Sequence, residues 1–126
     1  MNQLNQIILE GNAVKEPTFK EPVPGFGVAS FTVVSNHYYR DSKGEMTEEV
    51  SYVDVECYDT LAGKVMKEIC KGREIRIVGR LKQSRWQDEH NKWCSKLYII
   101  AEHIEFKPKP AAVSEEPKSA EEEPQL

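Results

Sequence analysis

The sequence predicts a small all-β domain, a barrel of five strands with one helix between the third and the fourth. Three observations predict it. Five segments alternate apolar and polar side chains with the period of two that is typical of half-buried strands. The segment after the third of them changes to the helical period. The chain of 126 residues fits one domain, and from Lys107 onward it is too rich in Glu and Pro to join a core.

The first strand is predicted at residues 7–11, where Ile7 and Leu9 share one side. The Gly-Asn pair that follows predicts a bulge or a bend, and a segment dense in turn residues lies at 22–27. The second strand, 28–36, is β-branched and aromatic, with apolar residues on one side and Ser and Thr on the other. The Asp-Ser-Lys-Gly segment after it predicts the loop of a hairpin.

The third strand, 50–58, carries Val and Cys on one side and Tyr, Asp and Glu on the other. Apolar residues then recur at every fourth position from 61 to 69, which predicts a helix of about three turns. Asp59 or Thr60 can cap its start, and Gly72 can take the left-handed position after its end.

The fourth strand, 72–86, and the fifth, 93–106, follow the helix and are separated by a turn at 88–91. The apolar side of the fifth strand is formed by Leu97, Ile99 and Ala101. Gly79, on the apolar side of the fourth strand, suits a tight bend in a small barrel. Three strands, a helix and two strands are the order of the OB-fold, a partly open barrel whose sheet face binds oligonucleotides.

The fourth strand has one apolar side, whereas its other side is basic and ends in an aromatic ring. The residues of this basic side are Arg76, Arg80, Lys82 and Trp86. Cations beside an exposed ring suit single-stranded nucleic acid, whose phosphates are anionic and whose bases stack. The alternative is an ordinary amphipathic strand with a solvated charged face. Two tyrosines on the non-core side of the third strand favour nucleic acid, because they put more rings beside the cations.

The candidate DNA-binding residues come from these two faces, from the loop after the second strand, which begins at Tyr39, and from the helix. The rings that can stack on bases are Tyr39, Tyr52, Tyr58 and Trp86. The cations that can contact phosphates are Arg40, Lys43, Lys64, Lys67, Arg76, Arg80, Lys82 and Arg85. Each stacked base contributes about 1–3 kcal/mol, with little regard to sequence. Asp54 and Glu56, between two of the tyrosines, are expected to pair with Arg or Lys of the next strand, from among Arg76, Arg80 and Lys82.

The charge of the chain is unevenly distributed. The net charge of −4 is carried by residues 111–126, which hold five Glu and one Lys. Residues 1–63 have four basic and ten acidic side chains, whereas residues 64–96 have ten basic and four acidic ones. A concentrated basic third in an otherwise neutral body is compatible with one positive surface that faces a polyanion.

Other classes of protein are disfavoured. Three cysteines without a Cys-x-x-Cys spacing argue against a disulfide framework and a zinc site. No apolar run has the length of a membrane span, and the first residues have no leader character, so we expect a cytoplasmic protein. No nucleotide-binding or nucleophile motif occurs, and the three histidines have no ligand spacing. We therefore expect neither a cofactor nor catalysis.

The chain resembles the bacterial single-stranded DNA-binding proteins of the homotetrameric OB-fold type from about Asn5 to Phe106. The resemblance is carried, in order, by residues 7–12 (Ile-Ile-Leu-Glu-Gly-Asn) with Pro17, 28–33 (Val-Ala-Ser-Phe-Thr-Val), 39–41 with 44–46, 61–62, 71–72, 77–81 (Ile-Val-Gly-Arg-Leu) and Trp86. It implies a homotetramer, associated with the nucleoid, that binds single-stranded DNA without strong sequence preference during DNA replication, recombination and repair. The family's three stacking tryptophans and one phenylalanine fall on Tyr39, Tyr52, Trp86 and Tyr58 respectively.

The residues from 107 to 126 form an acidic, Pro-rich tail that we expect to be disordered, outside an OB domain of residues 1–106. The resemblance implies that its tip recruits replication and repair proteins. The residues of the tip are Glu121, Glu122, Glu123, Pro124, Gln125 and Leu126. The family's terminal aromatic is missing here. The alternatives that the sequence leaves open are an OB-fold RNA binder, a dimeric primosome-type accessory protein and an OB module that binds protein.

Overall fold

The computed structural model describes residues 1–108. Its elements are β1 Ile7–Ala13, β2 Thr18–Val23, β3 Phe26–Arg40, β4 Met46–Tyr58, α1 Asp59–Glu68, β5 Glu74–Gln87 and β6 Trp93–Phe106. The predicted tail therefore lies outside the described residues, apart from its first two. Lys107 is bonded to the barrel, since its backbone N–H donates to the Glu74 carbonyl at 3.0 Å.

Five of the strands close a barrel in the order β1, β5, β6, β4, β3 and back to β1. β1 changes partner along its length, because Ile7 to Asn12 pair with β5 while Asn12 and Ala13 pair with β3. The closure needs a glycine at position 11, where a Cβ atom would lie 2.3 Å from the Val34 carbonyl oxygen. The predicted barrel of five strands with one helix is confirmed.

The core lies inside this barrel and alternates along the strands as the sequence predicts. Its largest fully buried side chains are Val33, Val55, Val65, Ile75, Ile77 and Ile99. Gly79 lies at a register shift of the β5–β6 pair, which leaves Glu102 of β6 without a partner residue. Backbone closes on this glycine so tightly that a Cβ atom would lie 2.1 Å from the Ile100 carbonyl oxygen. The bend that we predicted at Gly79 is therefore present.

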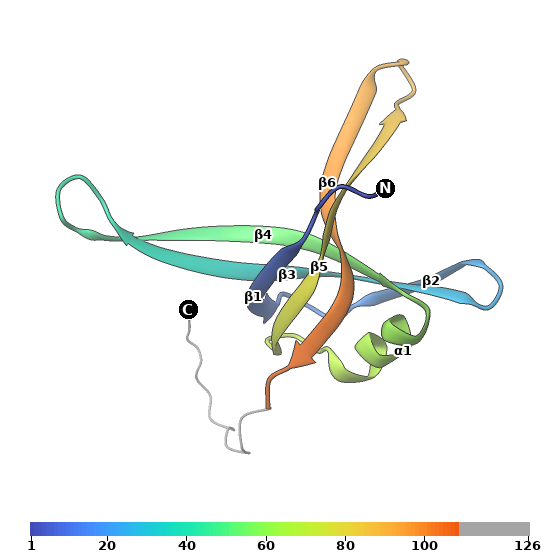
Figure 1. Cartoon of the computed structure of the whole chain (residues 1–126), viewed down its shortest axis with the longest axis horizontal. Coiled ribbons are helices and arrows are strands. Elements are labelled where there is room, and N and C mark those ends of the chain that lie inside the picture. Colours follow the sequence, from blue (N-terminus) through green and yellow to red (C-terminus); the bar gives the residue numbers. More distant parts are fainter. Residues whose placement is uncertain (109–126) are drawn as a thin grey trace.

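Two hairpins extend far beyond the core (Figure 1). We name them the β3–β4 arm, residues 35–51, and the β5–β6 arm, residues 81–98. In the first arm both strands continue closer to the turn than predicted. β3 extends to Arg40 rather than to residue 36, and β4 begins at Met46 rather than at residue 50. The turn at the tip of each arm is stabilised in the same way, by an Asp side chain that accepts hydrogen bonds from the backbone. The Oδ1 atom of Asp41, or of Asp88 in the second arm, accepts backbone N–H groups two and four residues later at 2.8–2.9 Å.

A sixth strand, β2, was not expected as a strand. It pairs with the edge of β3 and forms a third hairpin, on the right of Figure 1. Pro22 has no N–H to donate, and it is tolerated here because β2 is an edge strand with a register shift between Lys20 and Val23. The predicted turn segment thus narrows to the residues between β2 and β3.

The helix α1 packs Ala62 and Val65 into the core. The cap predicted for its start is wrong. Tyr58 occupies the cap position without a side-chain hydrogen bond, and Asp59 takes a left-handed backbone with φ of 58°. Gly72 has the predicted left-handed backbone, with φ of 87°, but it lies in the turn closed by the Arg73 N–H and the Cys70 carbonyl, three residues beyond the extended Ile69 that caps the helix.

Candidate nucleic-acid interface

A groove of about 340 Å³ lies on the outer face of the barrel, where β3 and β4 meet the β5–β6 arm. Its lining residues are Lys15, Glu16, Thr18, Ser30, Phe31, Thr32, Asp54, Val55, Glu56, Ser84, Trp86, Lys96 and Tyr98. Most of them alternate with core residues along their strands, and so they point away from the core. We call the side of the sheet that Thr32, Asp54, Trp86, Lys96 and Tyr98 share, opposite the core residues Phe31 and Val55, the outer face.

Besides the buried Phe31, two aromatic rings line the groove. Trp86 of β5 is 45% exposed, as a base-stacking ring must be. Tyr98 of β6 is half-buried and lies directly across the pair from Lys82, so ring and cation share the outer face. The sequence reasoning missed Tyr98, although the alternation of β6 already places it opposite the apolar Ile99.

Tyr52 and Tyr58 lie on the outer face of β4, on the same side as Asp54. Tyr52 is 69% exposed. Tyr58 is half-buried, its hydroxyl donates to Glu56 Oε1 at 3.2 Å, and its ring centroid lies 5.6 Å from that of Phe26. Burial and the neighbouring carboxylate raise the pKa of Tyr58 to about 12, so its ring is neutral at physiological pH.

Tyr39 lies on the opposite side of the β3–β4 arm from Tyr52. The unbroken register of the arm places Tyr52 beside Val34, and the side chains alternate from there to Tyr39. The Tyr39 ring stacks on His37 with centroids 6.3 Å apart. Tyr38, which the sequence reasoning passed over, lies on the Tyr52 side and is 54% exposed. Three of the four predicted stacking rings therefore share the outer face.

Two residues of the groove lining form an ion pair. Lys96 Nζ lies 2.8 Å from Asp54 Oδ2, and the Thr32 hydroxyl donates to Asp54 Oδ1 at 2.8 Å. The hydrogen bonds from Lys96 and Thr32 lower the pKa of Asp54, and the same pair raises the pKa of Lys96. The partner of Asp54 comes from β6, and Glu56 accepts from Tyr58, so the pairing predicted with the cations of 72–86 is wrong.

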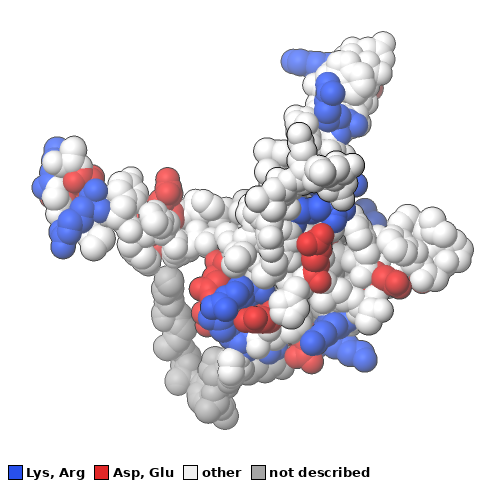
Figure 2. Space-filling model, viewed as in Figure 1, with Lys and Arg blue, Asp and Glu red and all other residues white. Residues whose placement is uncertain are grey.

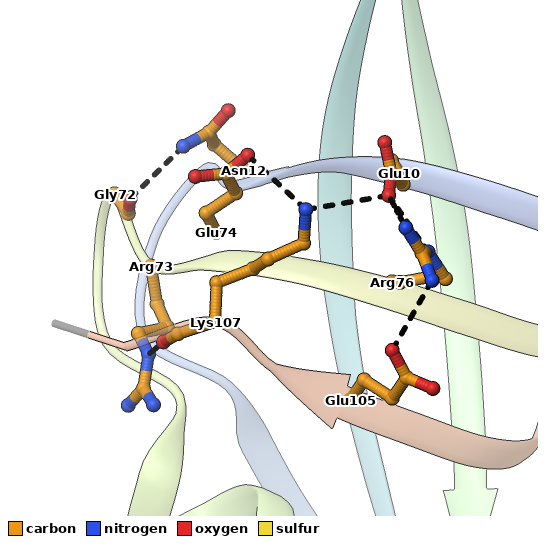
Figure 3. A network of polar contacts seen from close by, with 8 residues as sticks. All are labelled: Glu10, Asn12, Gly72, Arg73, Glu74, Arg76, Glu105 and Lys107. Atoms are coloured by element: carbon orange, nitrogen blue, oxygen red, sulfur yellow. Dashed lines mark hydrogen bonds and ion pairs between the residues drawn. The ribbon is translucent and has the colours of Figure 1, made fainter.

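Arg76 and Arg80 are already held by other carboxylates. Arg76 donates from Nε to Glu10 Oε2 at 2.7 Å and from its NH1 nitrogen to Glu105 at 3.3 Å (Figure 3). Arg76 and Lys107 together hold the pKa of Glu10 below its usual range. Arg80 contacts Glu102 at 3.1 Å. Neither arginine lines the groove.

The other predicted cations divide into three groups. Lys43, Lys67 and Lys82 make no ion pair within residues 1–108. Arg40 donates to the Gly44 carbonyl at the tip of the β3–β4 arm. Arg85 lies 5.0 Å from the Trp93 ring centroid and Lys64 lies 5.5 Å from that of Phe106.

The cations also divide by position. Figure 2 shows Lys and Arg side chains gathered at the ends of both arms. The helix that bears Lys64 and Lys67 contributes no residue to the groove. Lys15 and Lys96, which do line it, were missed by the sequence reasoning. The cations are therefore divided between the groove and the arm tips and do not follow β5 alone.

Neither a metal site nor a membrane span is found in the described part of the chain. No group of three His, Cys, Asp or Glu within residues 1–108 could hold a metal ion. No helix there is long and apolar enough to cross a membrane. Cys57 is buried, which raises its thiol pKa to about 12.

Solved structures share this fold. The structure titled "Plasmodium falciparum SSB complex with ssDNA" superposes with a TM-score of 0.79, at 24% identity, over 86% of this chain and 98% of that chain. A deletion mutant of the single-stranded DNA binding protein from Thermus aquaticus gives a TM-score of 0.75, at 24% identity, over 83% of this chain and 51% of that chain. Both therefore support the predicted OB-fold.

Relatives are found by sequence as well. The chain is 30% identical to the single-stranded DNA-binding protein of Aquifex aeolicus over 98% of its own length and 83% of that protein. It is 28% identical to single-stranded DNA-binding protein 2 of Chlorobaculum tepidum, over 84% and 72% respectively. For the protein of Deinococcus radiodurans, the identity is 29% over 81% of this chain and 34% of that protein.

A sequence profile agrees with these pairwise matches. The profile described as "Single-strand binding protein family" matches residues 4–107, which include every strand of the barrel. Because this match spans most of the chain and the Aquifex relative aligns over nearly all of it, the chain belongs to the single-strand binding protein family.

Proposed function

We propose that this chain binds single-stranded DNA without strong sequence preference and protects it during DNA replication, recombination and repair. The observation that carries the proposal is the set of rings on one continuous outer face. Trp86 and Tyr98 line the groove, and Tyr52 and Tyr58 lie on β4, which contributes three further residues to its lining. Rings of this kind receive the flat face of any base, which explains a binder that reads no sequence.

The same geometry favours single strands over duplexes. A base can lie on Trp86 only if it is unpaired and turned out of its stack, because in a duplex its faces are covered by its neighbours. Lys82, Lys15 and the arm tips supply cations for the phosphates, which makes binding weaker as salt is raised. The groove itself carries Asp54, Glu56 and Glu16 against two lysines, so stacking must supply most of the affinity there.

Tryptophan fluorescence tests this function. Trp93→Phe leaves Trp86 as the one indole of the chain. Titration with poly(dT) should quench its emission, and duplex DNA of equal nucleotide concentration should quench it far less. The titration is run at low and at high salt, and binding should weaken as salt rises. An emission that stays constant at low salt would contradict the proposal.

We also propose that the chain acts as a homotetramer. Family membership supports this, and so do large apolar side chains exposed on strands β1 and β6, where Ile8 is 66% and Leu97 58% exposed. Light scattering at several concentrations measures the molar mass. A mass of one chain at micromolar concentration would count against the tetramer.

The remaining proposals rest on family membership. The protein would act on the nucleoid of a bacterial cytoplasm as a binding protein without catalysis. The acidic tip 121–126, outside the described residues, would recruit replication and repair proteins. Pull-down of such enzymes with the full chain and with a chain that lacks Pro124 to Leu126 tests the tip, because equal recovery would exclude it.

A further inference from the structure

The outer face continues past Tyr58 onto the β2–β3 hairpin. Tyr58 pairs with Val28 of β3, and Val28 pairs with Lys20 of β2, so the three side chains form one row across three strands. Val28 and Phe26 share this side, because they are two residues apart on one strand. The groove reaches the same hairpin through Thr18 and Ser30, which pair with each other. The hairpin is therefore an extension of the proposed DNA-binding surface.

Phe26 enlarges the aromatic surface of Tyr58. Their ring centroids are 5.6 Å apart and their planes are inclined by 30°, so the rings lie side by side and neither covers the other fully. Phe26 is 40% exposed. An exposed phenyl ring next to a proposed stacking residue offers a second base a flat apolar surface.

The backbone beneath Phe26 is held in place from the opposite side. Phe19 of β2 packs on Gly27, where a Cβ atom would lie 2.6 Å from the Phe19 ring. The Gly25 N–H donates to Glu21 Oε2 at 3.3 Å across the turn. Because both contacts fix the hairpin without using Phe26, its ring is available to a ligand in a prearranged position.

A cation accompanies the rings. Lys20 lies on the outer face of β2, and within residues 1–108 it makes no ion pair. Lys20 pairs with Val28, which is two residues from Phe26, so Lys20 lies one strand spacing of roughly 4.8 Å across from Phe26 and about 7 Å along the hairpin. A phosphate of a nucleotide stacked on Phe26 can therefore reach Lys20 while its base remains on the ring.

We infer that the β2–β3 hairpin forms an additional nucleotide subsite, in which Phe26 stacks the base that follows the one on Tyr58 and Lys20 contacts its phosphate. The inference rests on the proposed function, since it assigns a further part of the same DNA path. It makes Phe26 a binding residue of this chain that neither the basic strand nor the groove lining revealed.

A reporter at the subsite tests the inference separately from the function. Phe26→Trp is combined with Trp86→Phe and Trp93→Phe, so that the introduced indole is the one fluorophore of its kind. Saturating poly(dT) should quench it, as it should quench Trp86 in the Trp93→Phe chain. If Trp86 is quenched and the introduced indole is not, the subsite is refuted while the function stands. If neither is quenched, the function itself fails.

Affinity measurements give an independent readout on the full chain. Phe26→Ala should weaken binding of oligothymidylate roughly 5- to 150-fold, which corresponds to about 1–3 kcal/mol for one stacked base. Phe26→Tyr should restore most of the affinity, and Lys20→Gln should lower the salt slope by about 0.7. Phe26→Leu keeps apolar volume and serves if the alanine chain unfolds. Equal affinity of the Phe26→Leu chain and the unsubstituted chain would overturn the inference. A molar mass changed by Phe26→Ala would also overturn it, because the lost affinity would then come from altered assembly.

Discussion

Lys96 of β6 pairs with Asp54 of β4 inside the groove, with Nζ and Oδ2 2.8 Å apart, on the outer face that also bears Trp86. A phosphate that approaches Lys96 therefore competes with a carboxylate that already holds it. The two side chains remain 54% and 44% exposed, so the pair contributes little to folding. Its consequence is expected in DNA affinity.

Asp54→Asn should tighten binding of single-stranded DNA. It removes one negative charge from the phosphate path and leaves Lys96 free to contact DNA. One charge at about 4 Å in water is worth about 1 kcal/mol, or roughly fivefold in affinity. Fluorescence anisotropy of a labelled oligothymidylate measures the change. Glu105→Gln removes a carboxylate outside the groove and is the matched control, for which no gain is expected.

The effect of Asp54 should not depend on pH between about 5 and 9. The pKa of Asp54 is lowered from 3.8 and that of Lys96 is raised from 10.5, so both groups are charged throughout this range. The small contribution of the pair to stability is likewise present above pH 3.8 and is lost as the pH falls through the lowered pKa. The ratio of the DNA affinity of the Asp54→Asn chain to that of the unsubstituted chain is measured at pH 5, 7 and 9. A ratio that approaches one at pH 5 would contradict the assignment.

Trp86→Ala should weaken binding to all base sequences alike, by about 1–3 kcal/mol for the lost stacking. Trp93→Ala is the matched control, because Trp93 pairs with Gln87 and lies on the side of the same arm that is opposite Trp86. On that side its ring contacts the Arg85 guanidinium. Anisotropy with oligomers of dT, dC and dA measures both variants. A loss confined to one base would mean that Trp86 reads sequence. A similar loss for Trp93→Ala at unchanged molar mass would place DNA on the opposite side of the arm.

Lys82→Ala should reduce the salt slope of binding by roughly 0.7, the value for one phosphate contact in single-stranded DNA. Lys82 has no ion pair within the described residues and lies beside Tyr98. Arg76→Gln should leave the slope unchanged, because its guanidinium is already engaged by Glu10 and Glu105. Affinities at four salt concentrations give both slopes. The reverse ranking of the two variants would show that DNA displaces those carboxylates.

The parts of the fold that the sequence predicts are those that face the core. The fifth predicted strand, 93–106, coincides with β6, and the apolar alternation of β5 buries Ile75 and Ile77. The alternation also identifies the outer face, since what is not core on these strands points outward. Leu81 and Leu97 continue the apolar side into the β5–β6 arm, yet they are exposed, because the arm has left the barrel.

The parts that were missed depend on contacts between distant segments. The sequence does not reveal the ion pair between Lys96 and Asp54, because the pair forms only through the parallel pairing of β4 with β6. Tyr39 was placed in a loop, whereas β3 continues through it and alternation then turns it away from Tyr52. The strand character of β2 was hidden by Pro22, which only an edge strand tolerates.

Two glycine substitutions should have opposite effects on stability. In Gly79→Ala the new methyl group would lie 2.1 Å from the Ile100 carbonyl oxygen and 3.0 Å from the Ala101 Cα atom. These are backbone atoms, so the barrel itself must shift, at a cost of roughly 1–3 kcal/mol or more. Gly63→Ala places the same methyl group on the exposed side of α1, where no atom lies within 4 Å, and should stabilise the helix by up to about 1 kcal/mol.

Thermal unfolding of both variants at one protein concentration tests this pair. About 1 kcal/mol corresponds to a shift in Tm of roughly 4–8 °C for a domain of this size. The Tm should therefore fall for Gly79→Ala and rise for Gly63→Ala. Because the two variants add the same atoms, a Tm for Gly79→Ala that equals or exceeds that of Gly63→Ala would mean that β5 and β6 do not close on each other at this bend.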